Sequence, residues 1–386
     1  MDKIFLKRTS RILAGHLWIF SNELATSPKN FEPGSLVEVY DNKKNFIGIG
    51  YINPHSLISV RILTRTKETI NPDFFRNRII NALNYRKRFL SDSNSCRLIY
   101  SEGDFLPGLI VDKYADCLAV QFLTLGMDRM TDMILSVLTE ILSPSVIVLR
   151  NDSQSRVLEG IPLEKKVIKG SMDVLPLIDE DGITIEVNPM TGQKTGFFLD
   201  QRENRVALGR YIKEGRGLDL FCYSGAWGLH LAKNAAFVTG VDDSETAISQ
   251  AKRNARLNNL ESRCNFKKDD VFNFLRKEKE SGSLYDFVIL DPPAFVKSKS
   301  KVKEALKGYR EINSMAIKII KEGGILATSS CSYHIEKEVF IGMLRDAAKD
   351  TKKNARLLEF RSQAKDHPIL LSVPETEYLK CAFIEL

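Results

Sequence analysis

The sequence predicts an α/β protein in which a small β-barrel-like module and an α+β insert precede a mainly parallel sheet with helices on both sides. Two observations support this prediction. Beyond Gly182, short apolar strands alternate with helical stretches, as in repeated strand–helix units. Before it, apolar runs are separated by turn residues such as Pro33 and Gly34. A chain of 386 residues is also long for one core, so we expect several domains.

The first segment, residues 1–68, is expected to form the β-barrel-like module, with β-like runs over 36–40 and 57–63. It also carries Arg8 and Arg11 ahead of Trp18, and such groups can contact phosphate and stack on the bases of RNA. Taken alone, these residues favour the other interpretation, in which the ring is core and the cations are solvated.

The middle segment, residues 69–178, is expected to be the α+β insert. Its helices are expected at 72–90 and 129–142, and its strands at 108–112, 117–122 and 146–149. Residues 179–386 are expected to form the Rossmann-like sheet. There a β run at 183–187 precedes strands at 217–221, 237–241, 264–267, 287–290 and 325–329, with helices at 246–257 and 302–321 among them.

A turn of small residues, Cys222 to Gly228, follows the first strand of this sheet and would let backbone approach a nucleotide-type cofactor. It lacks the full glycine pattern of dinucleotide-binding proteins. Acids at or near successive strand ends suit S-adenosylmethionine better than a nicotinamide. The residues expected to line the cofactor are Asp219, Phe221, Tyr223, Ser224, Gly225, Asp242, Asp270, Asp291 and Pro292.

Two features point to chemistry on a base. The strand at 287–290 runs into Asp291-Pro292-Pro293, which places a carboxylate and rigid backbone at the carboxyl edge of the sheet. The next strand runs into a small polar turn that carries Cys331. A lone cysteine is usually a small buried hydrophobe, but here the parallel arrangement would make Cys331 face Asp291 across the methyl donor.

This pair fits methylation of cytosine at carbon 5, which is too weak a nucleophile to take a methyl group unaided. A thiolate first adds to carbon 6, and carbon 5 of the resulting enamine attacks the methyl group before a base removes the proton and the thiolate leaves. Asp291 would hold the flipped-out base. Methylation of an exocyclic amine would need the acid but no cysteine.

With these motifs in place, the chain resembles the ribosomal RNA large subunit methyltransferase I family, class I S-adenosylmethionine-dependent enzymes that make 5-methylcytidine in 23S rRNA. The resemblance extends over the whole chain. The residues that carry it are Leu17–Phe20, Pro33–Ser35, Gln193–Arg202, Asp219–Gly228, Asp291–Phe295, Ser330–Ser332, Asp366–Pro368 and Glu377–Lys380.

The resemblance implies a PUA domain at 1–68, an α+β middle domain at 69–178 and a Rossmann-like catalytic domain at 179–386. It implies that Cys331 is the nucleophile and Asp291 the base-positioning acid, with residues 194–202 covering the mouth of the crevice. Its partner would be 23S rRNA or a large-subunit assembly intermediate, and the chain could form a homodimer. The residues expected to contact the substrate are Arg8, Arg11, Trp18, Lys194, Phe197, Gln201, Arg202, Pro293 and Phe295.

One departure from related enzymes concerns product release. Many RNA cytosine-5 methyltransferases carry a second cysteine after a proline in the Asp-Pro segment, and this chain has Pro292-Pro293 without one. The group that helps to release the product is therefore unassigned. His334 is close in sequence but is left out of the site, and Cys222 is interpreted as a packing residue.

Two other functions stay open. A related rRNA guanine methyltransferase family has a similar Asp-Pro-Pro segment and would transfer the methyl group directly, without a thiol. A noncatalytic RNA-binding ribosome-assembly protein could keep a degenerate methyltransferase fold, although the complete cofactor turn argues against it.

Composition is that of a soluble globular protein, with 43% hydrophobic and 27% charged residues. No apolar run approaches the roughly 18 residues that span a bilayer, and the start has no signal-peptide core, so a cytoplasmic location without membrane contact is expected. The six cysteines are scattered and include no Cys-x-x-Cys pair, so no metal is expected. The net charge of +7 is compatible with a polyanionic partner.

Overall fold

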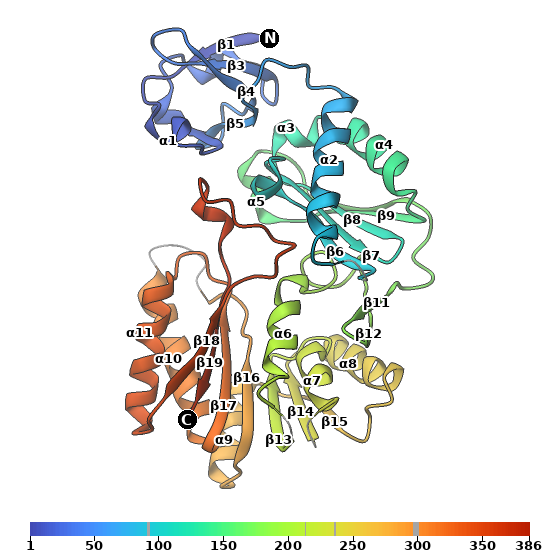
Figure 1. The fold of residues 1–386 in the computed structure, drawn as a ribbon, viewed down its shortest axis with the longest axis vertical. Helices are drawn as coiled ribbons and strands as arrows, with labels where there is room; N and C mark the ends of the chain where they lie inside the picture. The colour runs from blue at the N-terminus through green and yellow to red at the C-terminus, as the bar shows by residue number, and fades with distance from the viewer. Residues whose placement is uncertain (91–92, 213, 235–236, 296–300) are drawn as a thin grey trace. The chain divides into compact units, whose positions relative to one another are not determined.

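The structure of the protein is a computed structural model that describes residues 1–90, 93–212, 214–234, 237–295 and 301–386 (Figure 1). The chain divides into two compact units, and each is described by itself. The first comprises residues 1–178, 187–199 and 365–376, and the second comprises 179–186, 200–364 and 377–386. The domain boundaries predicted at residues 68 and 178 divide the chain differently and stay a prediction.

The N-terminal part of the first unit is a five-stranded sheet with the order β1-β3-β4-β5-β2. Successive side chains on a strand point to opposite faces, so Ile4, Val37 and Ile62 come together in one core. Both β runs expected in this segment are confirmed as strands. The elements are β1 (Asp2–Phe5), α1 (Ser10–Leu13), β2 (Trp18–Phe20), β3 (Leu36–Tyr40), β4 (Phe46–Ile52) and β5 (Ile58–Thr64).

A second five-stranded sheet, with the order β10-β9-β8-β7-β6, forms the middle of the first unit. Helix α2 (Pro72–Lys87) begins where the Asn71 side chain accepts a hydrogen bond from the Phe74 N–H, and it ends three residues before the predicted end. The other elements are β6 (Ser95–Tyr100), β7 (Leu109–Tyr114), β8 (Cys117–Phe122), α3 (Leu125–Asp128), α4 (Thr131–Leu142), β9 (Val146–Asn151), α5 (Gln154–Leu158) and β10 (Glu164–Lys169).

Buried polar contacts join these two sheets of the first unit. The Tyr51 hydroxyl donates to the Pro107 carbonyl at 2.7 Å. The Glu159 carboxylate accepts from the Asn53 amide and from the Arg61 guanidinium, both at 2.9 Å. Since buried polar groups are costly unless paired, these bonds help to fix one sheet on the other.

The second unit contains a seven-stranded sheet with the order β15-β14-β13-β16-β17-β19-β18. Strands β13 to β17 run parallel to one another, whereas β19 runs antiparallel to β17 and to β18. This confirms the predicted Rossmann-like, mainly parallel sheet. Its strands are β13 (Arg216–Leu220), β14 (Phe237–Asp242), β15 (Cys264–Lys268), β16 (Tyr285–Leu290), β17 (Ile320–Ser330), β18 (Arg356–Arg361) and β19 (Lys380–Glu385).

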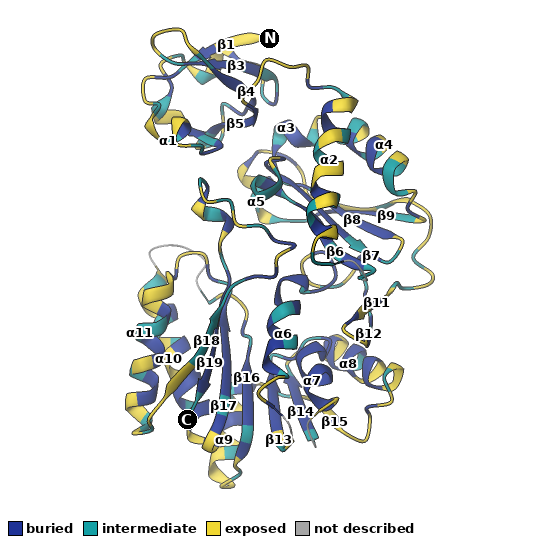
Figure 2. Ribbon diagram, in the orientation of Figure 1, coloured by how far each residue is buried: buried dark blue, intermediate teal, exposed yellow. Residues whose placement is uncertain are grey.

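Helices cover this sheet, and Figure 2 shows its central strands β16 and β17 as mostly buried. Helices α7 and α8 contact β14, and α10 contacts β17 and α11. The hairpin strands β11 (Leu177–Glu180) and β12 (Ile183–Glu186) precede them. The helices are α6 (Arg202–Leu208), α7 (Ala226–Ala232), α8 (Glu245–Leu257), α9 (Val271–Glu280), α10 (Val302–Lys318) and α11 (Lys337–Thr351).

Several predicted element ends differ from the observed ones, and two of the differences have a clear physical reason. The helix predicted to reach Lys321 stops at Lys318, because Ile320 already pairs with Tyr285 in a longer β17. The strand predicted to reach Phe221 ends at Leu220, because Phe221 has a left-handed backbone with φ of 64° and begins the turn.

The strand order locates the candidate site. From β13 the chain moves outward to β14 and β15, then returns to place β16 on the other side of β13. Ligands of open α/β sheets bind beyond the carboxyl ends of the strands at such a reversal. The turn after β13 and the Asp291 segment after β16 both lie there.

Candidate active site

The turn after β13 is held in an uncommon backbone conformation. Phe221 and Tyr223 have φ of 64° and 47°, and Gly225 has φ of 81°. A Cβ on Gly225 would lie 2.7 Å from the Phe266 ring, so only glycine fits there. The Tyr223 N–H donates to the Asp242 carboxylate at 2.9 Å. Strained backbone that is fixed in this way is concentrated at ligand sites.

Beneath this turn, Asp219 is fully buried and accepts a hydrogen bond from the Gly228 N–H at 2.8 Å. Burial and, to a smaller extent, the charges of Asp291 and Asp242 raise the pKa of Asp219 to about 7. Burial also raises the pKa of Asp242. Three acids that disfavour one another's ionisation would be stabilised by a cationic ligand.

The same site contains polar atoms that a ligand can use. Among the described residues, no hydrogen-bond partner is found for the buried Ser224 hydroxyl or for Asp219 Oδ1. Asp242 Oδ1 and Oδ2 each accept one backbone N–H, from Ser244 and Tyr223, which leaves each oxygen a further lone pair for a ribose hydroxyl. These residues therefore fit a cationic nucleoside such as S-adenosylmethionine.

Asp270 lies at a more exposed position at the start of α9. Its Oδ1 accepts the Asn273 N–H at 2.8 Å, so it is the N-cap of this helix. The cap uses one carboxylate oxygen. Its contact with an adenine amino group stays a prediction.

Asp291 is fixed by two side-chain donors. Gln201 Nε2 donates to Oδ1 and Trp227 Nε1 donates to Oδ2, each at 3.0 Å. Gln201 also donates to the Ser329 hydroxyl at 3.1 Å, and its own Oε1 accepts from Asn204 at 2.7 Å. Both donors stabilise the ionised carboxylate and set its orientation. Sequence reasoning did not find Trp227; an indole donor in the first turn of the helix after the cofactor turn was the available signal.

Cys331 follows the last residue of β17 and is half-buried. In the parallel pairing of β16 and β17, Leu290 is opposite Thr328. Asp291 and Cys331 therefore follow neighbouring strands at the same edge of the sheet, as the sequence predicted. The serines on both sides of Cys331 contact one phenol, since the Ser330 and Ser332 hydroxyls each lie 3.1 Å from the Tyr309 hydroxyl.

The other cysteines differ from Cys331 in exposure. Cys117, Cys222, Cys264 and Cys381 are buried, and only Cys96 shares the intermediate exposure of Cys331. Burial raises the pKa of each of the four buried thiols. A buried thiol that resists ionisation is a poor nucleophile.

Phe295 lines a cavity of about 400 Å³ beside the Asp291 segment. Its ring centroid lies 4.6 Å from that of Tyr309. Pro293 is exposed and Pro292 is buried. The residues that line this cavity are Phe272, Phe295, Lys301, Glu304, Ala305 and Gly308.

The segment 194–202 is divided between the two units. Lys194 is exposed and lies over the Phe198 ring at 4.5 Å, whereas Phe197 is 2% exposed, and both belong to the first unit. Gln201 and Arg202 belong to the second unit. Arg202 is buried and pairs with Glu180 at 3.4 Å, so its burial does not favour the predicted contact with substrate. The predicted cover over the crevice is left as a prediction.

Two of the N-terminal residues predicted to contact RNA, Arg11 and Trp18, make contacts within the first unit. The Arg11 guanidinium lies 4.3 Å from the Phe20 ring centroid and donates to the Trp18 carbonyl at 2.9 Å. The half-buried Trp18 indole donates to Glu102 at 2.7 Å. Arg8 is exposed. Their contact with RNA stays a prediction.

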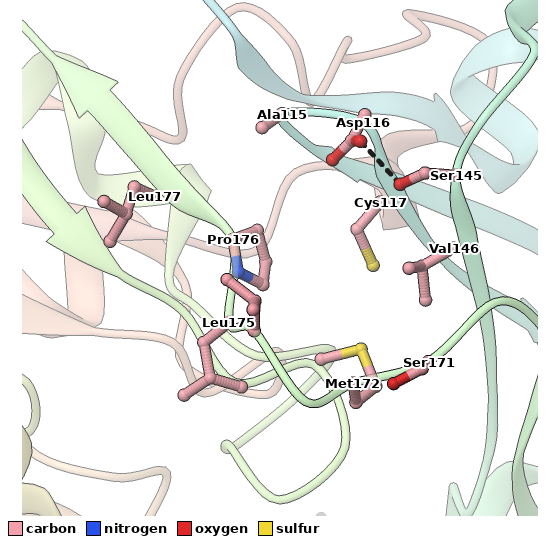
Figure 3. A pocket seen from close by; sticks show the side chains of 11 residues that line it. Ala115, Asp116, Cys117, Ser145, Val146, Ser171, Met172, Leu175, Pro176 and Leu177 are labelled. Atoms are coloured by element: carbon pink, nitrogen blue, oxygen red, sulfur yellow. Dashed lines mark hydrogen bonds between the residues drawn. The ribbon is translucent and has the colours of Figure 1, made fainter.

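A further cavity, of about 520 Å³, lies in the first unit between β8, β9 and residues 171–177 (Figure 3). Its polar groups include Ser145, whose hydroxyl donates to Asp116 at 2.5 Å. Its thiol, Cys117, has a pKa that burial raises to about 12. A cavity without an available nucleophile or unpaired charge does not suggest a second reaction centre.

Within the described ranges, no group of three or more His, Cys, Asp or Glu side chains is arranged to hold a metal ion. None of the helices in those ranges is long and apolar enough to cross a membrane.

Comparison with known proteins agrees with the geometry. Residues 4–65 match the model of a PUA-like domain, and residues 213–372 match that of a methyltransferase domain. The protein is thus a PUA-containing methyltransferase with a Rossmann-like sheet.

Relatives named ribosomal RNA large subunit methyltransferase I include those of Pseudoalteromonas atlantica and Shewanella frigidimarina. The first is 38% identical over 378 residues, with 97% of this chain and 96% of the relative covered. The second is 38% identical over 372 residues, with 95% and 94% covered. The chain belongs to the ribosomal RNA large subunit methyltransferase I family, as the resemblance predicted.

Solved structures show the same fold. SMU.776, provisionally described as a methyltransferase and solved as a complex with SAH, aligns over 100% of both chains with a TM-score of 0.86 at 20% identity. A protein from Streptococcus mutans, provisionally described as SAM-dependent, aligns over 100% of both chains with a TM-score of 0.84 at 21% identity. The expected fold class and S-adenosylmethionine as the cofactor of this family are confirmed.

Proposed function

We propose that the protein transfers a methyl group from S-adenosylmethionine to carbon 5 of a cytidine in 23S rRNA, through a covalent adduct between Cys331 and carbon 6 of the base. The observation that supports it is the joint position of Cys331 and Asp291 after neighbouring parallel strands. The relatives' name specifies a large-subunit ribosomal RNA substrate, and it specifies neither the base nor the position.

Asp291 and Cys331 have different roles in the proposed reaction. Asp291, fixed by Gln201 and Trp227, binds the cytosine through its ring nitrogen or exocyclic amine and orients carbon 6 toward the Cys331 sulfur. The Cys331 thiolate forms a bond to carbon 6, and the electron pair of the 5,6 double bond becomes available at carbon 5.

Bound S-adenosylmethionine supplies an electrophilic methyl group to carbon 5. A base then removes the hydrogen from carbon 5, the 5,6 double bond re-forms, and the carbon 6–sulfur bond breaks to return the Cys331 thiolate. The acids Asp219, Asp242 and Asp291 favour the cationic donor over its neutral product, because they concentrate negative charge at this edge of the sheet. Asp270 and Ser224 complete the proposed cofactor contacts.

The proposed RNA contacts use both units. Pro293 and Phe295 beside Asp291 would contact the flipped base, and the PUA-like domain with Arg8, Arg11 and Trp18 would contact the RNA outside the target nucleotide. Lys194 is exposed and would contact phosphate.

The test is transfer from labelled S-adenosylmethionine to unmodified 23S rRNA, followed by digestion to nucleosides and mass spectrometry. Label in 5-methylcytidine is expected. Label in a methylguanosine would contradict the thiol mechanism, and an absence of both label and cofactor binding would favour a noncatalytic RNA-binding protein.

A second experiment tests the adduct directly. RNA that carries 5-fluorocytidine has no hydrogen to lose from carbon 5 after methylation, so the adduct cannot break down. We expect a stable protein–RNA complex whose cross-linked peptide contains Cys331. Cross-linking through Cys96, the other half-buried cysteine, would contradict the assignment.

A further inference from the structure

A buried lysine from the C-terminal strand lies beside the turn that carries Cys331. In the antiparallel pairing of β17 and β19, Lys380 is directly opposite Ser330. Its Nζ donates to the Ser332 carbonyl and to the Tyr378 carbonyl, each at 2.7 Å. Strand pairing thus places Lys380 opposite the residue before Cys331, and a hydrogen bond ties its ammonium group to the residue after Cys331.

Within the described ranges, no carboxylate forms an ion pair with this ammonium group. Lys380 is 6% exposed, and two of its three N–H groups are bonded to neutral carbonyls. Burial lowers the pKa of Lys380 to about 8, while negative charge on Cys331 and Glu377 acts in the opposite direction. The group is still mostly protonated at neutral pH, and a buried cation is costly without a compensating negative charge.

The other ionisable groups near Cys331 do not supply a positive charge in the same way. Asp291 follows the neighbouring strand β16, and Glu377 precedes β19 as an exposed acid. Tyr309 on α10 is neutral, since burial and the charge of Cys331 raise its pKa. His334 is exposed beyond the turn. Near acids a thiolate is unfavourable, so Lys380 is the cation placed to offset them.

We propose that Lys380 is a positioning residue whose ammonium group is the counter-ion of the Cys331 thiolate and keeps that sulfur ionised at neutral pH. The use of the thiolate on cytosine rests on the proposed function, whereas the ion pair can be measured without RNA or cofactor. The position of this lysine follows from the strand β19, which returns antiparallel beside β17.

The test measures the rate of Cys331 alkylation by iodoacetamide between pH 5 and pH 10, by peptide mass spectrometry. The full chain carries Cys96→Ser so that Cys331 is the remaining half-buried thiol. Lys380→Met removes the charge and keeps most of the volume, and Lys380→Arg keeps the charge. We expect Lys380→Met to raise the pH midpoint of alkylation by about one unit, a tenfold loss of thiolate, and Lys380→Arg to leave it nearly unchanged.

An unchanged midpoint in folded Lys380→Met protein would overturn the proposal. If Lys380→Met does not fold, the pH midpoint of Cys331 alkylation in the parent protein still tests the proposal. A midpoint at or above the roughly 8.5 of an ordinary thiol would exclude a stabilised thiolate. The midpoint of Cys96 in a Cys331→Ser protein is the matched control.

Measurements of kcat test the proposed ion pair independently of the proposed reaction. With RNA and cofactor, Lys380→Met should lower kcat about tenfold at pH 7, and the loss should shrink as the pH rises and the thiol ionises unaided. A merely structural role would not make the loss depend on pH. Formation of 5-methylcytidine with an unchanged midpoint would refute only the ion pair, and a shifted midpoint with an active Cys331→Ala enzyme would refute only the proposed function.

Discussion

Two buried acids in the second unit have opposite electrostatic surroundings. Glu180 accepts from Arg205 at 2.5 and 2.8 Å and lies 3.0 Å from His230 Nε2. Burial alone would raise the pKa of Glu180, but Arg205 and His230 outweigh it and hold the pKa well below its usual range. Asp219 is equally buried, and its pKa is raised to about 7, because burial and the charges of Asp291 and Asp242 outweigh the Gly228 N–H and the charge of Arg205.

The difference distinguishes the charge of Glu180, which stabilises the fold, from that of Asp219, which can stabilise a ligand. Around Glu180 each charge is offset inside the protein, so the cluster joins β11 to α6 and α7. Around Asp219 the Gly228 N–H and the charge of Arg205 do not outweigh burial and the neighbouring acids, so a cationic ligand would favour its ionised form. The same contrast applies to Arg202, which the resemblance suggested as a substrate contact and which the structure pairs with Glu180.

The largest effect should come from the candidate active site, at Cys331. Cys331→Ala is expected to lower methyl transfer by about 10⁴-fold or more, since carbon 5 is then not activated. Cofactor binding, measured by calorimetry, should be unchanged. Cys96→Ala is the control and should keep full activity. A loss of cofactor binding in Cys331→Ala would count against a nucleophile role.

The next largest effect is expected in the cluster of Glu180, Arg205 and His230, and it should be a loss of stability. Glu180→Gln leaves Arg205 and His230 without their buried anion and is expected to lower the free energy of unfolding by about 3–5 kcal/mol. Denaturant unfolding measures this. Glu186→Gln, which breaks a more exposed pair with Arg253, should cost less than about 1 kcal/mol. Equal losses of unfolding free energy in Glu180→Gln and Glu186→Gln would contradict this difference between the buried cluster and the exposed pair.

A third change tests the raised pKa of Asp219. A folded pKa near 7, against an unfolded value of 3.8, means that the folded state holds the proton more tightly, so stability is full below pH 3.8 and falls until pH 7. Asp219→Asn removes this titration. Relative to the parent, it should gain on the order of 2–4 kcal/mol between pH 4 and pH 8.

Asp286→Asn is the matched control with the opposite sign. Burial works to raise the pKa of Asp286, but the Arg216 N–H and Lys321 outweigh it and lower the pKa. Its stabilising contribution is present above pH 3.8 and is lost as the pH falls through the folded value. If Asp219→Asn showed the same pH dependence as Asp286→Asn, the two surroundings would not differ as described.

The smallest effect concerns the orientation of Asp291. Trp227→Phe removes one donor to its carboxylate and keeps the aromatic packing, and Gln201 still holds the other oxygen. We expect about a tenfold lower kcat/KM, roughly 1.4 kcal/mol. Tyr211→Phe, which removes a hydroxyl donation to Glu359, is the control and should have no effect. An unchanged rate in Trp227→Phe would show that Gln201 alone suffices.

Much of the fold could be predicted from local patterns. The parallel strands of the second unit were found because each is a short apolar run between helical stretches, and parallel pairing then requires their carboxyl ends to share one edge. The sequence alone therefore predicts Asp291 with Cys331, and Asp219 with Asp242, at that edge. Strands β18 and β19 were not predicted, although they extend the sheet beyond β17.

The sequence by itself determined the residue types at the strand ends, and with them the class of chemistry, because periodicity and strand order place those residues on one edge. Only the tertiary structure decided which side chains support them. Gln201 reaches Asp291 across 90 positions, and Lys380 reaches the Cys331 turn across 48. Such contacts depend on which strand lies next to which, and that order is set by packing between residues far apart in the sequence.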